Sequence, residues 1–133
     1  MVIGDSVTSI GFSVFHNCSS LTNIIIGDSV KSIGSIAFAS CTSLTSIEIP
    51  NSVTSIDDNA FRYCTSLTSV VIPNSVTSID TYAFSDCTNL KEIKYLGTKK
   101  EAMKLGIGNR SKKKWREDSS ISKIICTDGT IEL

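Results

Sequence analysis

The sequence predicts a solenoid, a predominantly β structure in which short equivalent units stack on one another and are joined by turns. Five columns of similar residues recur every 23 positions over residues 1–95, each in four copies. One unit is too small to bury its own apolar side chains, so its neighbours must cover both of its faces. We expect about five to six layers in a right-handed stack.

The repeat is defined by valine, isoleucine, phenylalanine, cysteine and leucine columns at one fixed spacing. The columns are Val7, Val30, Val53 and Val76; Ile10, Ile33, Ile56 and Ile79; Phe15, Phe38, Phe61 and Phe84; Cys18, Cys41, Cys64 and Cys87; and Leu21, Leu44, Leu67 and Leu90. Five columns in register do not arise by chance, so the period determines the architecture.

Each unit begins with a short strand, as in the stretch LTSIEIP at residues 44–50. Ile47 and Ile49 flank Glu48, which is the alternation expected of a strand with one buried face. Pro50 ends the strand because proline lacks the N–H that a continuing ladder would use. The Asn-Ser pair that follows is typical of a turn.

The second half of each unit contains another extended stretch and a tighter segment. Val53 and Ile56 are expected to point inward from the extended stretch. The Ala-Phe-x-x-Cys segment at residues 60–64 is expected to form a short helical turn, because Phe61 and Cys64 would then share one face.

Residues 96–133 depart from the period but contain one more layer. The spacing of Leu90, Ile93 and Tyr95 recurs in Ile121, Ile124 and Cys126, now after a step of 31 positions. This match predicts a final strand near residues 121–126, reached by a longer excursion of the chain.

A helix and a hairpin are predicted on either side of this strand. Thr98 and Glu101 form an S/T-x-x-E capping box, which indicates a helix start, and Gly106 is a suitable stop. The stretch TDGT at residues 127–130 predicts a type I′ hairpin, with Ile131 on the return strand. We expect the helix and the hairpin to cover the end of the stack as a C-terminal capping unit, whereas no N-terminal cap is evident.

The distribution of charged residues also changes near residue 96, where the regular repeat ends. Residues 1–95 carry four basic side chains against eight acidic ones, a net charge of −4, and residues 96–133 carry nine against five, a net charge of +4. We therefore expect a solenoid over residues 1–95 and a capping unit over residues 96–133. No apolar run approaches the roughly 20 residues of a membrane helix, and the start lacks the blocks of a secretory signal. The chain opens partway into the repeat, which suggests a piece of a longer protein.

The consensus L-x-x-I-x-I-P-x-S-V-x-x-I-x-x-x-A-F-x-x-C-x-x-L resembles the BspA-like leucine-rich repeat over about residues 1 to 95. Gly4 and Gly27 stand where other copies have proline, and Val14 stands for alanine. The resemblance implies a curved solenoid of the kind found on the surfaces of bacteria and some parasitic protozoa, and therefore an extracellular or cell-surface location as part of a longer chain. Similar GTKEE-like endings recur in the family, so residues 96–133 resemble its C-terminal cap.

The aligned cysteines do not predict a metal site. Stacked layers place Cys18, Cys41, Cys64 and Cys87 in a row about 4.8 Å apart, which cannot form the tetrahedron that zinc requires. Parallel Cβ directions also disfavour disulfides, and the fifth cysteine, Cys126, leaves an odd number. We expect small buried thiols that fill a column, and neither a metal nor a cofactor.

No catalytic constellation is present in the sequence. His16 is the only histidine, and it occupies a variable repeat position together with Ala39, Arg62 and Ser85. The Asp57–Asp58 pair is likewise replaced in the other copies. We therefore expect no catalytic residues and no enzyme activity.

One candidate partner-binding surface is the set of outward-pointing strand positions. The set consists of Asn23, Ile25, Ser46, Glu48, Ser69, Val71, Glu92 and Lys94. Ile25 and Val71 are apolar where alternation predicts polar residues, and exposed apolar area often marks contact surfaces. The alternative is that β-branched residues simply suit strands.

A second candidate is the basic run SKKKWRE at residues 111–117. Lys112, Lys113, Lys114 and Arg116 could bind an anionic ligand, with Trp115 as a stacking face. The alternative is an exposed loop in which Trp115 covers the last layer, and short charged runs favour this interpretation.

The preferred function is a non-catalytic module for protein–protein interaction or adhesion, within a larger cell-surface protein, as the resemblance implies. The alternative is a structural spacer that displays other domains. The partner would be a protein or host-surface ligand, nucleic acid is not expected, and self-association through the uncapped N-terminal layer is a further possibility.

Overall fold

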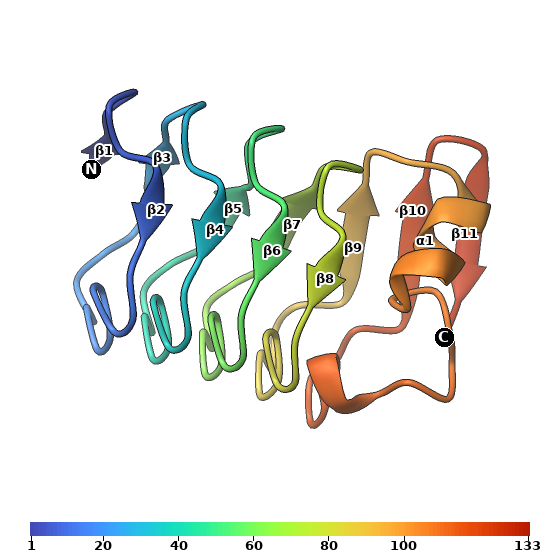
Figure 1. Cartoon of the computed structure of the whole chain (residues 1–133). Coiled ribbons are helices and arrows are strands. Elements are labelled where there is room, and N and C mark those ends of the chain that lie inside the picture. Colours follow the sequence, from blue (N-terminus) through green and yellow to red (C-terminus); the bar gives the residue numbers. More distant parts are fainter.

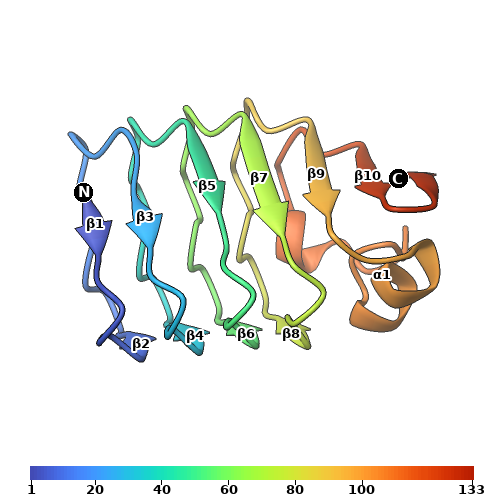
Figure 2. The ribbon, with the colours of Figure 1, turned by 90° about the horizontal axis from the view of Figure 1, so that it is seen from above.

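The computed structural model describes residues 1–133 as a rod of stacked layers, with the N-terminus at one end and the helix and last strands at the other (Figure 1). Parallel strands form two walls of the rod (Figures 1 and 2). The first wall contains β1 (Val2–Ile3), β3 (Ile25–Ile26), β5 (Ser46–Glu48), β7 (Ser69–Ile72), β9 (Glu92–Tyr95) and β10 (Lys123–Cys126). The second wall contains β2 (Ser9–Ile10), β4 (Ser32–Ile33), β6 (Ser55–Ile56) and β8 (Ser78–Ile79).

The register of the strands confirms the predicted solenoid. On the first wall Ser46 pairs with Ser69, and on the second wall Ile56 pairs with Ile79. Partners in neighbouring layers are therefore one repeat of 23 positions apart in the sequence. Ile93 of β9 pairs with Ile124 of β10, which is the longer step expected from the sequence. The final strand predicted near residues 121–126 is β10.

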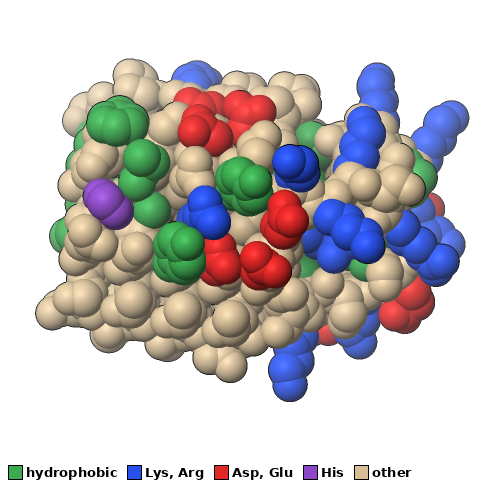
Figure 3. Space-filling model, turned by 90° about the horizontal axis from the view of Figure 1, so that it is seen from below, with side chains coloured by type: hydrophobic (Ala, Val, Ile, Leu, Met, Phe, Trp, Pro, Cys, Tyr) green, Lys and Arg blue, Asp and Glu red, His purple; other side chains and the backbone are tan.

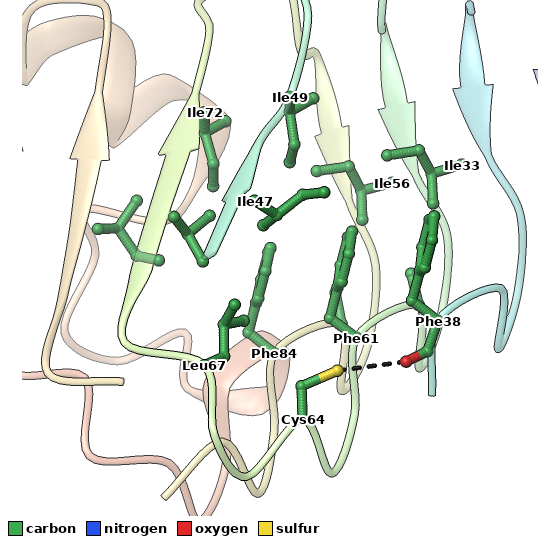
Figure 4. Packing of buried hydrophobic residues seen from close by; sticks show 14 of the residues in the cluster. Ile33, Phe38, Ile47, Ile49, Ile56, Phe61, Cys64, Leu67, Ile72 and Phe84 are labelled. Carbon is green, nitrogen blue, oxygen red and sulfur yellow. Dashed lines mark hydrogen bonds between the residues drawn. The ribbon is translucent and has the colours of Figure 1, made fainter. Parts of the chain in front are cut away.

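The core consists of files of equivalent side chains that run along the rod. The rings of neighbouring phenylalanines in the file from Phe15 to Phe84 are stacked, with centroid separations of 5.1, 5.2 and 5.0 Å. Figure 4 shows part of this file beside the isoleucines of the second wall. Phe38, Phe61 and Phe84 are fully buried, so each ring has a neighbouring layer on both of its faces.

The predicted helical turn at residues 60–64 is wrong, because this segment is a run of turns. Its backbone has positive φ at Asn59 (60°) and Tyr63 (62°). The Arg62 N–H donates within the turn to the Asn59 carbonyl at 3.2 Å, but the Phe61 N–H donates to Ala83 of the next layer at 2.8 Å. A helix would use both N–H groups internally, whereas here alternate N–H groups bind the neighbouring layer.

The predicted helix is α1 (Lys99–Leu105), and its boundaries follow the expected signals. The Thr98 side chain accepts a hydrogen bond from the Glu101 N–H, and the Glu101 carboxylate accepts one from the Thr98 N–H. Gly106 ends the helix in the left-handed conformation, with φ of 102°. Because α1 is short, no helix of the chain is long and apolar enough to cross a membrane.

The predicted hairpin is present, but its turn differs from the expected type. β11 (Gly129–Glu132) runs antiparallel to β10, and Ile131 lies on it as expected. Thr127 and Asp128 form the turn without positive φ, and only Gly129 has one, at 138°. A type I′ turn needs positive φ at both central residues, so this assignment was wrong. The Asp128 carboxylate instead accepts a hydrogen bond from the Lys99 N–H at 2.8 Å, which ties the turn to α1.

The basic run forms the turn of a fifth layer, which includes the 3₁₀ helix η1 (Lys114–Arg116). The Phe84 N–H donates to the Trp115 carbonyl at 2.7 Å, and the two rings meet edge to face at 6.3 Å. Trp115 therefore takes the phenylalanine position and covers the last ring of the file. The step from Phe84 to Trp115 equals the step from Ile93 to Ile124, so the match that predicted β10 could also have predicted this role.

Candidate interaction surface

The eight outward-pointing residues predicted from the sequence all lie on the first wall. Glu48 pairs in register with Val71, and Val71 pairs with Lys94, so these three form one file. Ile25 pairs with Val2 on the separate β1–β3 sheet. The strand ladder is interrupted between β3 and β5, but Ile25 and Glu48 line the same hollow.

The apolar members of this surface differ in exposure. The Ile25 side chain is 64% exposed, and its neighbour Val2 is 69% exposed. Val71 is half-buried, whereas Glu48 and Lys94 are exposed. The apolar part of the surface is therefore concentrated at the N-terminal half of the wall.

Polar residues flank this file on the same wall. Asn23, Ser46 and Ser69 are exposed, and Glu92 is half-buried. The Glu92 carboxylate pairs with the Lys123 ammonium group of β10 at 3.4 Å. The flanking file thus continues into the last layer of the stack.

A hollow of about 450 Å³ joins the apolar and polar parts of the first wall. Ile25 and Pro50 contribute apolar surface to its lining, and Asn23, Ser46 and Glu48 contribute polar groups. The lining of this hollow therefore mixes apolar and polar groups.

The cysteine column makes contacts that its sequence pattern does not predict. The thiols of Cys41, Cys64 and Cys87 each donate a hydrogen bond, at 3.2 Å, to the carbonyl of the phenylalanine 26 residues earlier. Figure 4 shows the one from Cys64 to Phe38. All five cysteines are free, and these three are fully buried. Burial raises the pKa of the Cys41 thiol to about 11 and that of Cys87 to about 12. These thiols are therefore protonated structural groups at neutral pH, and no group of three or more His, Cys, Asp or Glu side chains could hold a metal ion.

The face formed by the turns has an uneven distribution of side chains. Figure 3 shows hydrophobic side chains and the histidine over the N-terminal half, and Lys and Arg over the C-terminal segment. Phe12 is 70% exposed and Val14 57% exposed on the first layer. Further along, the Arg62 guanidinium lies between the Tyr63 and Tyr82 rings, at 4.8 and 4.6 Å from their centroids.

Arg62 is also held by hydrogen bonds across two layers. Its Nε donates to the Asp86 carboxylate at 2.9 Å, which raises the pKa of the guanidinium, and its Nη1 donates to the Asn59 side chain at 3.3 Å. The repeat pattern gave no signal for this cluster, because its residues occupy variable positions.

The other candidates from the sequence lie apart from one another. His16 is exposed. Asp58 accepts hydrogen bonds from the side chains of Ser35 and Asn59, which lower its pKa. Partial burial, with the nearby charges of Asp80 and Asp58, raises the pKa of Asp57.

The basic run places its lysines and its tryptophan in different environments. Lys112, Lys113 and Lys114 are exposed, and Arg116 is half-buried. Trp115 is only 5% exposed, because it packs on Phe84, so its ring offers no free face on which a ligand could stack.

Comparisons with known proteins agree with this architecture. A family profile described as the BspA type leucine-rich repeat region, in six copies, matches residues 1–104. No curated protein sequence matches the chain.

Three solved crystal structures are similar to this chain. A leucine-rich cell surface protein from Faecalibacterium prausnitzii is 40% identical, with a TM-score of 0.76, over 78% of this chain and 27% of that one. A leucine-rich repeat protein from Bacteroides ovatus is 32% identical, with a TM-score of 0.75, over 96% and 30% of the two chains. A leucine-rich repeat protein from T. pallidum is 33% identical, with a TM-score of 0.66, over 86% and 58%.

This chain spans less than two thirds of the length of each of those proteins. The two walls of this chain repeat every 23 positions. The chain belongs to the BspA-type leucine-rich repeat family.

Proposed function

We propose that this chain is a non-catalytic protein-binding module that contributes to adhesion and is part of a larger cell-surface protein. The observation that carries the proposal is the exposure of Ile25, at 64%, on β3, which pairs in register with β1 of the preceding layer. An exposed apolar side chain on a rigid sheet loses little conformational entropy when a partner covers it. Family membership supports the proposal, because leucine-rich repeat proteins generally act as interaction modules.

The proposed binding surface combines the 450 Å³ hollow with the outward file of the first wall. Ile25 would provide an apolar anchor, while Glu48 and Lys94 would provide charges of opposite sign at different layers. Such a pattern would determine the register of an extended partner segment along the rod. The cell-surface location rests on the F. prausnitzii protein, which is described as a leucine-rich cell surface protein.

The test measures binding of the purified chain to immobilised extracellular-matrix proteins and to host cells. Ile25→Glu should weaken binding at least about tenfold, because a charged side chain at the centre of an apolar contact costs roughly 1.4 kcal/mol or more. Val14→Glu is the matched control, because it introduces the same charge at an exposed valine on the turn face. Equal effects of the two variants would contradict binding through the first wall.

The alternative function is a structural spacer. The near-parallel stacking of the phenylalanine rings, with interplanar angles of 11°, 3° and 4°, favours a straight and uniform rod. A spacer predicts no saturable binding by this chain, whereas shortening the rod within the full-length protein would reduce the activity of the domains that it displays.

A further inference from the structure

Two hollows lie side by side where the basic run meets the last repeat. The first, of about 430 Å³, lies between the end of β8 and the C-terminal end of α1, and Asp80, Thr81 and Gly106 are part of its lining. The second, of about 700 Å³, is lined by Arg110, Ser111, Lys113, Arg116 and Leu133. Ser111 and Lys113 line both hollows. We call the combined surface the basic groove, and its cations are Arg110, Lys112, Lys113, Lys114 and Arg116.

The cations of the basic groove have no carboxylate partners. The chain contains two ion pairs, Arg62 with Asp86 and Lys123 with Glu92, and neither involves the groove. Asp80 supplies the one carboxylate side chain among the lining residues of the two hollows. Five cationic side chains are therefore held close together by the fold without ion-pair partners, which favours an anionic ligand.

Two residues that line the groove also carry buried hydrogen-bond donors without acceptors. Trp115 Nε1 and Arg116 Nε are buried, and neither has a hydrogen-bond partner in the protein. Leaving a buried donor unpaired costs about 1–3 kcal/mol. Such groups are rare in native proteins and call for an explanation, of which a bound ion is one.

The indole N–H is not needed for packing. Four preceding layers have phenylalanine in the same file, and the fifth layer has Trp115 there, with its ring edge on Phe84. A phenylalanine would continue the file, so the tryptophan adds a hydrogen-bond donor to a residue that lines the groove. A ligand with several acceptor oxygens would satisfy these groups.

We propose that the basic groove binds the sulfate groups of a sulfated polysaccharide. Two adjoining hollows fit a ligand whose anionic groups are spaced along a chain. Single-stranded nucleic acid is disfavoured because it binds largely by base stacking on exposed aromatic rings, and Trp115 is only 5% exposed. This site is separate from the proposed protein-binding surface on the first wall.

The experiment titrates the full chain with heparin, by calorimetry and by the fluorescence of Trp115, which is the only tryptophan. Replacement of Lys112, Lys113 and Lys114 by glutamine should weaken heparin binding at least about tenfold. The matched control replaces Lys99, Lys100 and Lys104 of α1 by glutamine, which changes the net charge equally, and should weaken binding less than threefold. No binding of heparin, or equal losses in the two variants, would overturn the proposal.

Trp115→Phe removes the unpaired indole N–H without disturbing the stack, because phenylalanine is the residue that the other layers have at this position. Calorimetry should show heparin binding weakened about three- to tenfold, with an unchanged circular dichroism spectrum. Unchanged affinity would remove the indole N–H from the proposed site. A single-stranded oligonucleotide of equal charge should bind more weakly than heparin, and tighter binding would assign the groove to nucleic acid instead.

Discussion

At the scale of single residues, the cysteine column combines two roles in one small side chain. Each buried thiol fills the space between layers, and its S–H also donates to a phenylalanine carbonyl of the preceding layer, which accepts a backbone N–H as well. A hydrophobic residue of similar size would provide only the first role. The column therefore links layers by polar contacts as well as by apolar packing.

Cys64→Ala should lower the free energy of unfolding by about 1–3 kcal/mol, because it leaves the Phe38 carbonyl without its thiol donor and opens a small cavity. Cys64→Ser should lower it less, because a hydroxyl can still donate to the same carbonyl. Urea unfolding of both variants measures the difference. Equal stability of the alanine variant and the parent chain would show that the S–H contact contributes nothing.

The free energy of unfolding should decrease as pH rises from about 8.5, the pKa of an unfolded cysteine, toward 12. Burial raises the pKa of Cys41 to about 11 and that of Cys87 to about 12, so in this range the native chain holds protons that the unfolded chain has lost. Below pH 8.5 the buried thiols make their full contribution to the free energy of unfolding, and this contribution is lost as the thiols of the folded chain ionise. Urea unfolding at several pH values measures the slope, and Cys87→Ala should make it less steep. A free energy of unfolding that rises with pH in this range would contradict the raised pKa values of the buried thiols.

At the scale of the repeated element, the turn segments require left-handed residues at fixed positions. Ser13, Ile36, Asn59 and Tyr82 occupy one such position, with φ between 60° and 63°. Asparagine suits this conformation, whereas a β-branched side chain is strained in it. The element thus tolerates a residue that its backbone disfavours, because hydrogen bonds to the next layer determine its shape.

Ile36→Asn should raise the free energy of unfolding by about 1 kcal/mol, because it relieves the strain of a β-branched residue at φ of 61°. Thermal unfolding measures the change. The reverse substitution at the equivalent position, Asn59→Ile, should lower stability, also because Asn59 accepts a hydrogen bond from Arg62. A destabilised Ile36→Asn variant would indicate that packing of the isoleucine outweighs its strain.

The sequence was sufficient to predict the strands but not the turns. Ile47 and Ile49 predicted a strand by alternation, because burial of one face depends only on local periodicity. The Phe61 to Cys64 spacing fits a helix equally well, and only contacts with the next layer exclude one. Local spacing cannot show where backbone N–H groups find their acceptors.

Because local spacing does not reveal contacts between layers, the sequence predicted the outward file of the first wall but not the basic groove. The outward positions followed from alternation; Ile25 is exposed as expected, whereas Val71 and Glu92 are half-buried. The groove between β8 and the basic run is lined by residues about 30 positions apart in the sequence. The buried donors of Trp115 and Arg116 lack acceptors because of how the folded chain packs around them. The sequence shows the run of lysines, but the hollow that they line could not be predicted from it.

At the scale of the whole molecule, stability depends on contacts between layers. The rings of Phe15 to Phe84 form one file, and the strands of both walls pair only with equivalent strands of neighbouring layers, apart from the final hairpin. In such a structure the free energy is approximately a sum over layers and their interfaces. Removing a complete layer should therefore preserve the fold, whereas removing part of a layer should not.

The most direct test of this account is equilibrium urea unfolding of two deletion variants. Deletion of residues 47–69, one full repeat, should leave a folded chain that unfolds cooperatively with a lower midpoint and a smaller urea dependence. Deletion of residues 47–58, about half a repeat, should abolish the cooperative transition because every later file shifts out of register. Equal tolerance of the two deletions, or loss of folding in the first, would contradict a stack of equivalent layers.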